Sequence, residues 1–233
     1  MSRKRELAVE LAPRLLEPGP LVLVTSLFRA QHNVMTAGWV LPLGFQPARV
    51  AVAIHPSRLT HEFISRGDTF ALNVPTLDLL NAVHRCGLES GRERDKFVTA
   101  GLTPSDALAI EPPLVTECVA HIECGLVERV SLADHDLFVG EVLAASADEA
   151  AFGDRWLVGD GVELLHHVAA DHYAGLSTTY RAKLGDDRMP AEAGVPPHDA
   201  TDFARTHLQR GKDSGRHATA ARSPCCFVRC PLI

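Results

Sequence analysis

Residues 115–144 read VTECVAHIECGLVERVSLADHDLFVGEVLA, and this stretch decides the fold class. Its two ends, residues 115–130 and 137–144, are rich in branched aliphatic side chains, and the more polar residues 131–136 (SLADHD) form the bend between them. This is the pattern of a β-hairpin, and its length predicts a bent or bulged pair of strands.

Shorter apolar runs on either side of the hairpin predict further strands. They lie at residues 21–25, 34–41, 50–54, 70–74 and 162–168. Helices are predicted at residues 3–16, 59–65 and 77–86. Many short strands with few helices between them favour a mainly β antiparallel barrel over a doubly wound parallel sheet. The sequence has neither a GxGxxG dinucleotide fingerprint nor a GxxxxGK phosphate loop, so a nucleotide cofactor would be bound without those devices.

Composition and charge exclude several classes of protein. The 233 residues are 46% hydrophobic and 22% charged, which is typical of a globular protein. The 23 Lys and Arg stand against 29 Asp and Glu, a net charge of −6, so the chain lacks the basic surface that nucleic acid requires. No apolar run approaches the roughly 18 residues that cross a bilayer, and the first residues have no signal-peptide core. We therefore expect a soluble, cytoplasmic protein that binds neither nucleic acid nor a membrane.

The chain divides into a folded part and a tail. Residues 1–185 are predicted to form one domain, and residues 186–233 a mostly disordered tail. Gly, Pro, Asp, Arg, His and Thr dominate the tail, which has no sustained period of 2 or 3.6 residues. Cys225, Cys226 and Cys230 lie in this tail, and the spacing of the six cysteines indicates no disulfide framework.

Hydroxyl and amide side chains gather at predicted strand ends and at one helix start. Residues 24–26 (VTS) and 33–37 (NVMTA) belong to strands, and residues 57–60 (SRLT) begin a helix, with Ser57 or Thr60 as its N-cap. The N–H groups of such a helix start form an anion site. Residues 90–97 (SGRERDKF) add a glycine for a tight turn and three cations for a phosphate. The alternative is a set of ordinary turns and caps beside solvated charges.

The order and spacing of these segments distinguish the two interpretations. The series VTS (24–26), NVMTAGW (33–39), SRLTH (57–61), FALNVP (70–75), SGRERDKF (90–97) and ADHDLFVGEV (133–142) resembles the flavin reductase-like family of FMN-binding split barrels. The resemblance implies a Greek-key-like antiparallel split β-barrel with a few peripheral helices. It also implies a homodimer that holds one FMN per subunit near the interface.

The resemblance further implies which residues bind FMN. The strand at 33–37 would line the flavin ring, and residues 55–60 would meet the ribityl chain and the phosphate, with Asn73 supporting that loop. The phosphate would be gripped from residues 90–96, with Lys96 as its cation. The full implied set is Thr25, Ser26, Asn33, Met35, Thr36, Ala37, His55, Pro56, Ser57, Arg58, Leu59, Thr60, Asn73, Ser90, Gly91, Arg92 and Lys96.

The bend of the hairpin bears on the electron donor. Residues 133–135 are Ala-Asp-His, where NAD(P)H-using members of the family often have Gly-Asp-His, so the resemblance implies that Asp134 and His135 bind the nicotinamide. If the turn requires a positive φ at Ala133, alanine is unfavourable there and NAD(P)H binding is weakened. The alternative is a plain hairpin turn with a solvated histidine.

Two groups of cysteine and histidine mimic metal sites. Cys118, His121 and Cys124 lie on one predicted strand, where the histidine points away from the two thiols, and six strand residues separate the thiols by about 20 Å. We therefore expect no metal there. The histidines at 166, 167 and 172 lack the spacing of a helical zinc pair, which favours a structural or interface role. The resemblance leaves the alternative that they border the pocket, because it implies that the region before Tyr173 approaches the partner's cofactor.

The resemblance implies an oxidoreductase, an NAD(P)H:FMN reductase in which hydride passes from NADH or NADPH to FMN. No catalytic acid or base of the protein is needed for that transfer. Reduced flavin would then serve a partner monooxygenase or another electron acceptor. Two alternatives stay open: a flavoredoxin-like electron carrier reduced by a protein partner, which the alanine at position 133 favours, and a barrel that binds no flavin.

Overall fold

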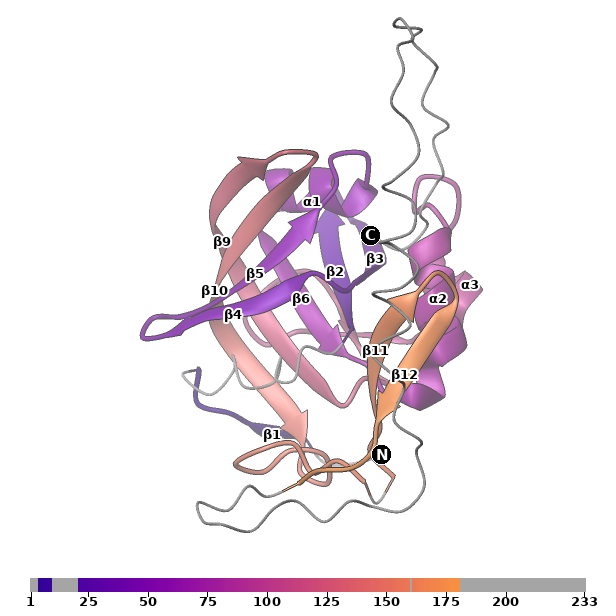
Figure 1. Ribbon diagram of the computed structural model, residues 1–233. Helices are drawn as coiled ribbons and strands as arrows, with labels where there is room; N and C mark the ends of the chain where they lie inside the picture. The colour runs from indigo at the N-terminus through magenta and orange to yellow at the C-terminus, as the bar shows by residue number, and fades with distance from the viewer. Residues whose placement is uncertain (1–3, 10–20, 160, 181–233) are drawn as a thin grey trace, which may run out of the picture. The chain divides into compact units, whose positions relative to one another are not determined.

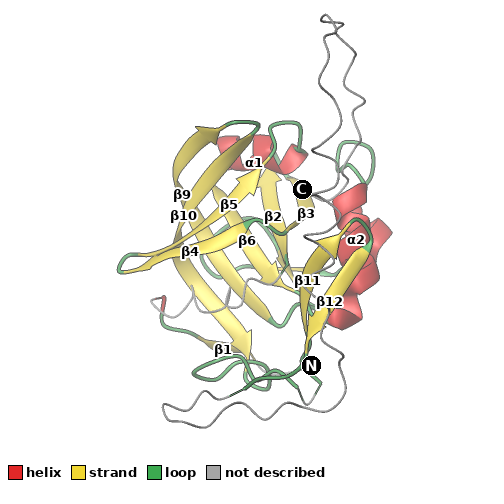
Figure 2. Ribbon diagram, in the orientation of Figure 1, coloured by secondary structure: helices red, strands yellow, loops and turns green. Residues whose placement is uncertain are grey.

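The computed structural model describes residues 4–9, 21–159 and 161–180. Its main sheet has eight antiparallel strands in the order β3-β2-β6-β9-β10-β5-β4, with β1 added on β10 (Figure 1; Figure 2). These strands are β1 (Lys4–Glu6), β2 (Val22–Phe28), β3 (Gln31–Ala37), β4 (Val40–Phe45), β5 (Ala48–Ile54), β6 (Thr69–Val74), β9 (Ala120–Leu132) and β10 (His135–Asp148). The predicted mainly β barrel is confirmed.

The remaining elements cover the sheet. They are the helices α1 (Leu59–Gly67), η2 (Leu77–Leu79), α2 (Leu80–Leu88) and α3 (Lys96–Ala100), and the short strand pairs β7 (Pro104–Ser105) with β8 (Leu114–Val115) and β11 (Leu164–Ala169) with β12 (His172–Leu176). Helix α1 packs against β2 and β3, and α2 lies beside α3 and β3 (Figure 1). Within the described residues, no helix is long and apolar enough to span a membrane.

The hairpin that defines the fold is formed by β9 and β10. Its register shifts at Val139/Gly140 and again at Val142/Ala144, so the predicted bulges are present. Residues 116–119 are not part of β9, because the chain turns after β8 and Val119 donates its N–H to Val74. The bend is shorter than predicted, since Leu132 already pairs with His135.

The predicted N-terminal helix is wrong in its described part. Residues 4–6 form β1, which pairs with residues 146–148 of β10. Strand β5 pairs with β10 only from Asp136 to Glu141, so the edge of β10 beyond that point is open to another strand. Residues 10–16 of the predicted helix lie outside the described residues.

The predicted strand at 34–41 is two strands. Strand β3 ends at Ala37 and β4 begins at Val40, so the chain changes direction at Gly38 and Trp39. The carbonyl of Trp39 accepts a hydrogen bond from the N–H of Ala53, which holds this connection against the end of β5. The break therefore places the end of β3 next to the end of β5.

Strand β2 is buried on both faces. Val22 and Val24 pack into the barrel interior, whereas Leu23 packs outward with Val83 of α2 and Phe97 of α3. Successive strand residues point to opposite faces, so a strand that is apolar at every position needs a layer on each side. The helices α2 and α3 supply the outer layer, and they also carry side chains of the cavities described next.

The boundary at residue 185 and the tail at 186–233, with Cys225, Cys226 and Cys230, lie outside the described residues.

Candidate functional site

Two adjoining cavities lie between β3, the start of α1 and the end of α2. Met35 and Arg58 line both of them. The first cavity is lined by Met35, Thr36, Ala37, Gly38, Trp39, Ala53, Ile54, His55, Arg58 and Gly87. The second is lined by Asn33, Met35, Ser57, Arg58, Leu59, Thr60, Cys86, Leu88, Glu89, Ser90, Gly91 and Lys96.

The first cavity has a wall of strand backbone with small and apolar side chains. The end of β3, the connection at Gly38 and Trp39, and the end of β5 form it. The Thr36 hydroxyl donates to the carbonyl of Val83, which ties β3 to α2. Such a wall offers an apolar surface and main-chain polar groups side by side, which suits a planar ring with a polar edge.

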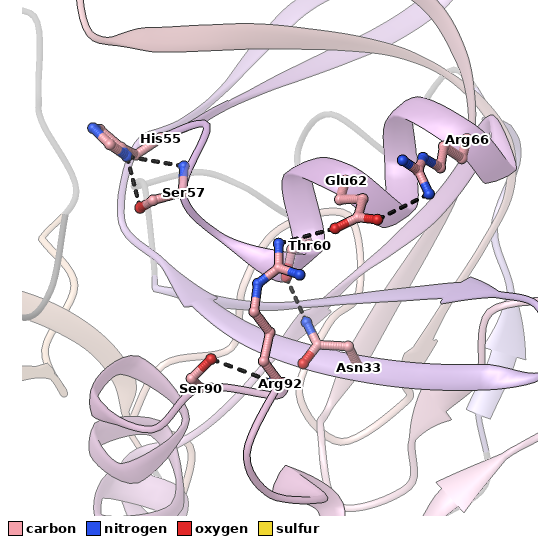
Figure 3. Close-up of polar contacts among 8 residues, drawn as sticks. All are labelled: Asn33, His55, Ser57, Thr60, Glu62, Arg66, Ser90 and Arg92. Atoms are coloured by element: carbon pink, nitrogen blue, oxygen red, sulfur yellow. Dashed lines mark hydrogen bonds and ion pairs between the residues drawn. The ribbon is translucent and has the colours of Figure 1, made fainter.

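The N-terminus of α1 bounds the second cavity. Arg58 is its N-cap residue, and no side chain in the described part of the chain caps the helix. Ser57 and Thr60 are engaged elsewhere: the Ser57 hydroxyl lies 2.8 Å from Nδ1 of His55, and the Thr60 hydroxyl accepts a hydrogen bond from Asn33 (Figure 3). The prediction that Ser57 or Thr60 caps the helix is therefore wrong. The first-turn N–H groups and the helix dipole favour an anion at this end.

Lys96 is a buried cation in the second cavity. It is 5% exposed, and its Nζ donates a hydrogen bond to the main-chain carbonyl of Cys86 at 3.1 Å. Burial lowers the pKa of Lys96 to about 8 and raises the pKa of the Cys86 thiol to about 11. A cation that has lost its hydration and is bonded to a neutral carbonyl favours an anionic ligand as its partner.

Asn33 and Gly91 meet at the floor of the same cavity. Asn33 Nδ2 donates to the Thr60 hydroxyl at 2.7 Å, whereas its Oδ1 is buried without a hydrogen-bond partner among the described residues. A Cβ placed on Gly91 would lie 2.0 Å from that Oδ1, so only glycine fits. The amide oxygen of Asn33 therefore lacks a hydrogen-bond donor next to a glycine that leaves room around it. A ligand with hydroxyl or N–H groups can donate the missing hydrogen bond.

Arg92 lies outside the cavity lining. Its guanidinium donates to the Glu62 carboxylate at 2.9 Å, and Glu62 also pairs with Arg66 at 3.0 Å (Figure 3). Ser90 accepts the N–H of Arg92, which closes the turn that presents Gly91. Arg92 thus braces the loop at 90–92 against α1.

Four more residues of the implied set line neither cavity. Asn73 is fully buried behind the site, where its Nδ2 donates to the Leu23 carbonyl and its Oδ1 accepts the N–H of Val115. Its hydrogen bonds therefore join β2, β6 and β8. The other three are Thr25, Ser26 and Pro56.

Three aromatic rings meet beside the first cavity, and two of them, those of Trp39 and His55, line it. The His135 ring lies 4.9 Å from the ring of Trp39 and 5.2 Å from that of His55. His135 Nδ1 is 2.8 Å from Asp134 Oδ1, and this hydrogen bond lowers the pKa of the Asp134 carboxyl. His135 Nε2 is buried with no hydrogen-bond partner among the described residues. His135 therefore packs on two residues that line the first cavity, and Asp134 is bonded to His135, although neither lines the cavity.

Ala133 has a φ of +46°, so the turn does require the left-handed conformation that alanine disfavours. The turn between β11 and β12 repeats the tripeptide Ala-Asp-His at residues 170–172, with a φ of +49° at Ala170 and 2.8 Å between His172 Nδ1 and Asp171 Oδ1. The two turns differ in burial, because the His172 side chain is 79% exposed and that of His135 only 11%.

Several residues that line the cavities are outside the set that the resemblance implies. Trp39 belongs to the NVMTAGW segment but lies beyond the residues assigned to the ring, and Gly87 comes from α2. Cys86, Leu88 and Glu89 directly precede the Ser90-Gly91 turn, and that adjacency was the signal available for them. Within the described ranges, no three His, Cys, Asp or Glu side chains are grouped as metal ligands.

The geometry favours one kind of ligand. The strand wall of the first cavity suits a flat ring, and the second cavity combines a helix N-terminus, a buried ammonium and an unpartnered amide oxygen. An elongated molecule with a planar heterocycle at one end and a phosphate at the other meets these requirements.

Comparisons with known proteins agree with this chemistry. Residues 15–176 match the model of the flavin reductase like domain. The uncharacterized protein YddH of Escherichia coli is 36% identical over 176 residues, which cover 73% of this chain and 93% of YddH. An FMN-binding domain of a flavin reductases-like enzyme from Shewanella baltica has a TM-score of 0.72 and 27% identity, covering 78% of this chain and 98% of its own. The flavoredoxin of Desulfovibrio vulgaris has a TM-score of 0.64 and 26% identity, covering 71% and 90%.

Proposed function

The chain belongs to the flavin reductase-like family, and from this premise we propose that it is an FMN-binding oxidoreductase that reduces FMN with NADH or NADPH. The observation that best supports this function is the pair of adjoining cavities, which share Met35 and Arg58 in their linings. One end offers a strand wall for a planar ring, and the other offers a helix N-terminus and a buried lysine for a phosphate.

Each end of the site has its own task. The main chain of β3 from Asn33 to Ala37 would hydrogen-bond the polar edge of the ring, and the first turn of α1, Gly91 and Lys96 would hold the phosphate. Bound there, FMN supplies the redox chemistry, because its ring accepts a hydride from a nicotinamide. The chain provides position and charge for that transfer, and no acid or base of its own.

The turn at Ala133–His135 is the proposed site for the nicotinamide nucleotide. His135 packs on Trp39 and His55, and both of these line the ring end of the site. Its bond to Asp134 directs the free position of the imidazole to Nε2, which is buried and unpartnered among the described residues. A ligand entering over Trp39 supplies the missing partner.

We also propose a homodimer formed through β4. This strand ends the order of the main sheet and exposes a run of large apolar side chains: Trp39 before it, then Leu41, Leu43 and Phe45. An exposed apolar edge strand is a surface that proteins normally cover. Because Trp39 also lines the first cavity, a second copy seated there borders the flavin ring. Replacing Leu43 and Phe45 with glutamate should convert the dimer to a monomer in light scattering, and an unchanged mass would refute this interface.

The experiment that tests the function is a spectrum of the purified protein before and after NADH or NADPH. We expect FMN to bind with quenched fluorescence, and the yellow absorbance to bleach as the nicotinamide is oxidised. A protein that leaves the fluorescence of added FMN unchanged would refute flavin binding. Reduced flavin then serves a partner monooxygenase or another electron acceptor.

A flavoredoxin-like electron carrier is the second candidate. The strained Ala133, at a turn where nicotinamide-using relatives often have glycine, favours it. Such a carrier binds FMN but leaves both NADH and NADPH unoxidised, and it is reduced by a protein partner. The same spectra separate the two candidates, because the carrier would bleach with a chemical reductant and stay yellow with either nicotinamide.

A further inference from the structure

A hydrogen-bonded pair outside both cavities joins the two ends of the site. His61 lies in the first turn of α1, directly after Thr60, and Asp136 lies in β10, directly after His135. His61 Nε2 and Asp136 Oδ2 are 2.8 Å apart, and each side chain is 12% exposed. One short, shielded contact therefore connects a helix start to a hairpin that follows it by 75 residues.

The surroundings fix this contact in place. The His61 ring meets the buried Phe138 ring edge-on, with 5.0 Å between centroids and 86° between planes. Arg129 makes a longer contact to the same carboxylate, with its Nε 3.6 Å from Asp136 Oδ2. The hydrogen bond with His61 is the main reason that the pKa of Asp136 is lowered, so the carboxylate is ionised at neutral pH and the bond is charge-assisted.

Each partner lies beside a segment that the site uses. Thr60, which precedes His61, lines the second cavity. Asp136 pairs in the sheet with Ile54, which lines the first cavity, and it follows His135 in the chain. A displacement of α1 relative to the hairpin therefore changes both cavities at once.

We propose that His61 and Asp136 are positioning residues whose bond holds the first turn of α1 and the Ala133–His135 turn in one fixed relation, so that the phosphate end and the nicotinamide end of the site are ordered together. The inference rests on the proposed function for the identity of the two ligands. Neither residue lines a cavity, so each acts through its neighbours.

Three variants and a matched control separate positioning from simple stability. His61→Leu removes the bond and keeps an apolar side chain against Phe138, whereas His61→Gln keeps a donor. Asp136→Asn removes the charge and keeps the shape. The control is Glu141→Gln. Glu141 of β10 forms an ion pair at 3.3 Å with Arg49 of β5, five positions along the ladder from the pair of Asp136 and Ile54.

The first readout is ligand binding. In fluorescence titrations, His61→Leu should weaken FMN by about tenfold, the size expected for losing one charge-assisted bond that holds a site. In turnover with saturating FMN, the KM for NADH or NADPH should rise by a similar factor with kcat changed less. His61→Gln should restore most of both losses, and Glu141→Gln should change neither. FMN affinity and KM within about twofold of the parent, with only thermal stability reduced, would overturn the inference.

The second readout does not depend on turnover. In His61→Leu the rate of amide hydrogen exchange should rise both at the first turn of α1 and at residues 132–135. In Glu141→Gln the exchange rates of both segments should equal those of the parent protein. Faster exchange at one of the two segments alone would overturn the inference. Should the parent protein bind FMN but oxidise neither nicotinamide, the reductase proposal would fail while FMN affinity and exchange still decide whether His61 and Asp136 couple the two turns.

Discussion

The Lys96 ammonium and the main-chain oxygen of Cys86 are joined by a hydrogen bond in the wall of the second cavity. The carbonyl offers a dipole where the buried ammonium has lost its hydration, and this imbalance lowers the pKa of Lys96 to about 8. Lys96 is thus held in place for a phosphate before a ligand arrives. Its buried charge lowers the stability of the folded protein when no ligand is bound.

FMN affinity should fall as pH rises through the pKa of Lys96. In the free protein Lys96 is charged below about pH 8 and neutral above it, and a bound phosphate favours the charged form. Between about pH 7 and about pH 9 the charged fraction falls about tenfold, so the Kd for FMN should rise by about that factor. Riboflavin, which lacks the phosphate, should show a flat profile in the same fluorescence titration. Parallel profiles for the two flavins would show that Lys96 does not meet the phosphate.

Lys96→Met should stabilise the flavin-free protein while weakening FMN binding. The folded pKa of about 8 lies below the ordinary value of 10.5, so the unfolded chain binds more protons between these values and parental stability rises with pH across that window. Below pH 8 Lys96 is charged in the folded state, so the destabilisation by its buried charge is complete. Removing it should add about 1 to 3 kcal/mol to the free energy of unfolding at neutral pH.

Urea denaturation without flavin measures this effect. Above about pH 10.5 the parent and Lys96→Met should converge, because Lys96 is then neutral in both the folded and the unfolded state. A variant that is less stable than the parent at neutral pH would mean that the bond to Cys86 outweighs the desolvation of the ammonium.

Gly91→Ala should impair FMN binding through Asn33. The added methyl would lie 2.0 Å from Asn33 Oδ1 and 3.0 Å from Leu59. Asn33 must move, and its bond to the Thr60 hydroxyl at the start of α1 is then lost. We expect at least a tenfold rise in the Kd for FMN. Gly153→Ala is the control, because a methyl there meets no atom within 4 Å, and equal affinities for the two variants would contradict the close approach.

Acid should destabilise the fold through His121. This side chain is 2% exposed, bonded to the Val115 carbonyl at 2.9 Å, and burial lowers its pKa to about 4. The unfolded chain therefore takes up a proton first as the pH falls below 6.5, and stability decreases from there towards pH 4. Between about pH 7 and about pH 4.5 the loss should be roughly 2 kcal/mol. His121→Gln, which keeps the shape and cannot titrate, should show a shallower decline in urea midpoints over this range.

The sequence predicted the order of elements well because strand patterns are local. The hairpin of β9 and β10 and the helix at 59–65 are each visible in a short window. The helix predicted at residues 4–6 is wrong for a tertiary reason. These residues form a strand because the edge of β10 beside them is open, and the local spacing of apolar residues does not depend on that edge.

Site residues were harder to predict than strands. The implied set names Asn73 as a support for the loop at 55–60, but an amide at a strand end can serve either face, and here it joins β2 to β8. Arg92 lies in a motif with three cations, yet its charge is engaged by Glu62, thirty residues away. Which cation meets the ligand depends on burial and pairing across the fold, and no local pattern records either.

Ala133→Gly should both stabilise the protein and improve nicotinamide binding. A φ of +46° costs an alanine about 1 kcal/mol relative to glycine, so the variant should unfold at a higher urea concentration. If the turn binds the nicotinamide, relief of this strain should also lower the KM for NADH or NADPH. The control is built into the chain, because Ala170 adopts a φ of +49° in the same tripeptide beside an exposed His172. Ala170→Gly should give a similar gain in stability with an unchanged KM. Equal KM values for the two variants would show that the turn at Ala133 does not bind the nicotinamide. The flavin would then receive its electrons from a protein partner.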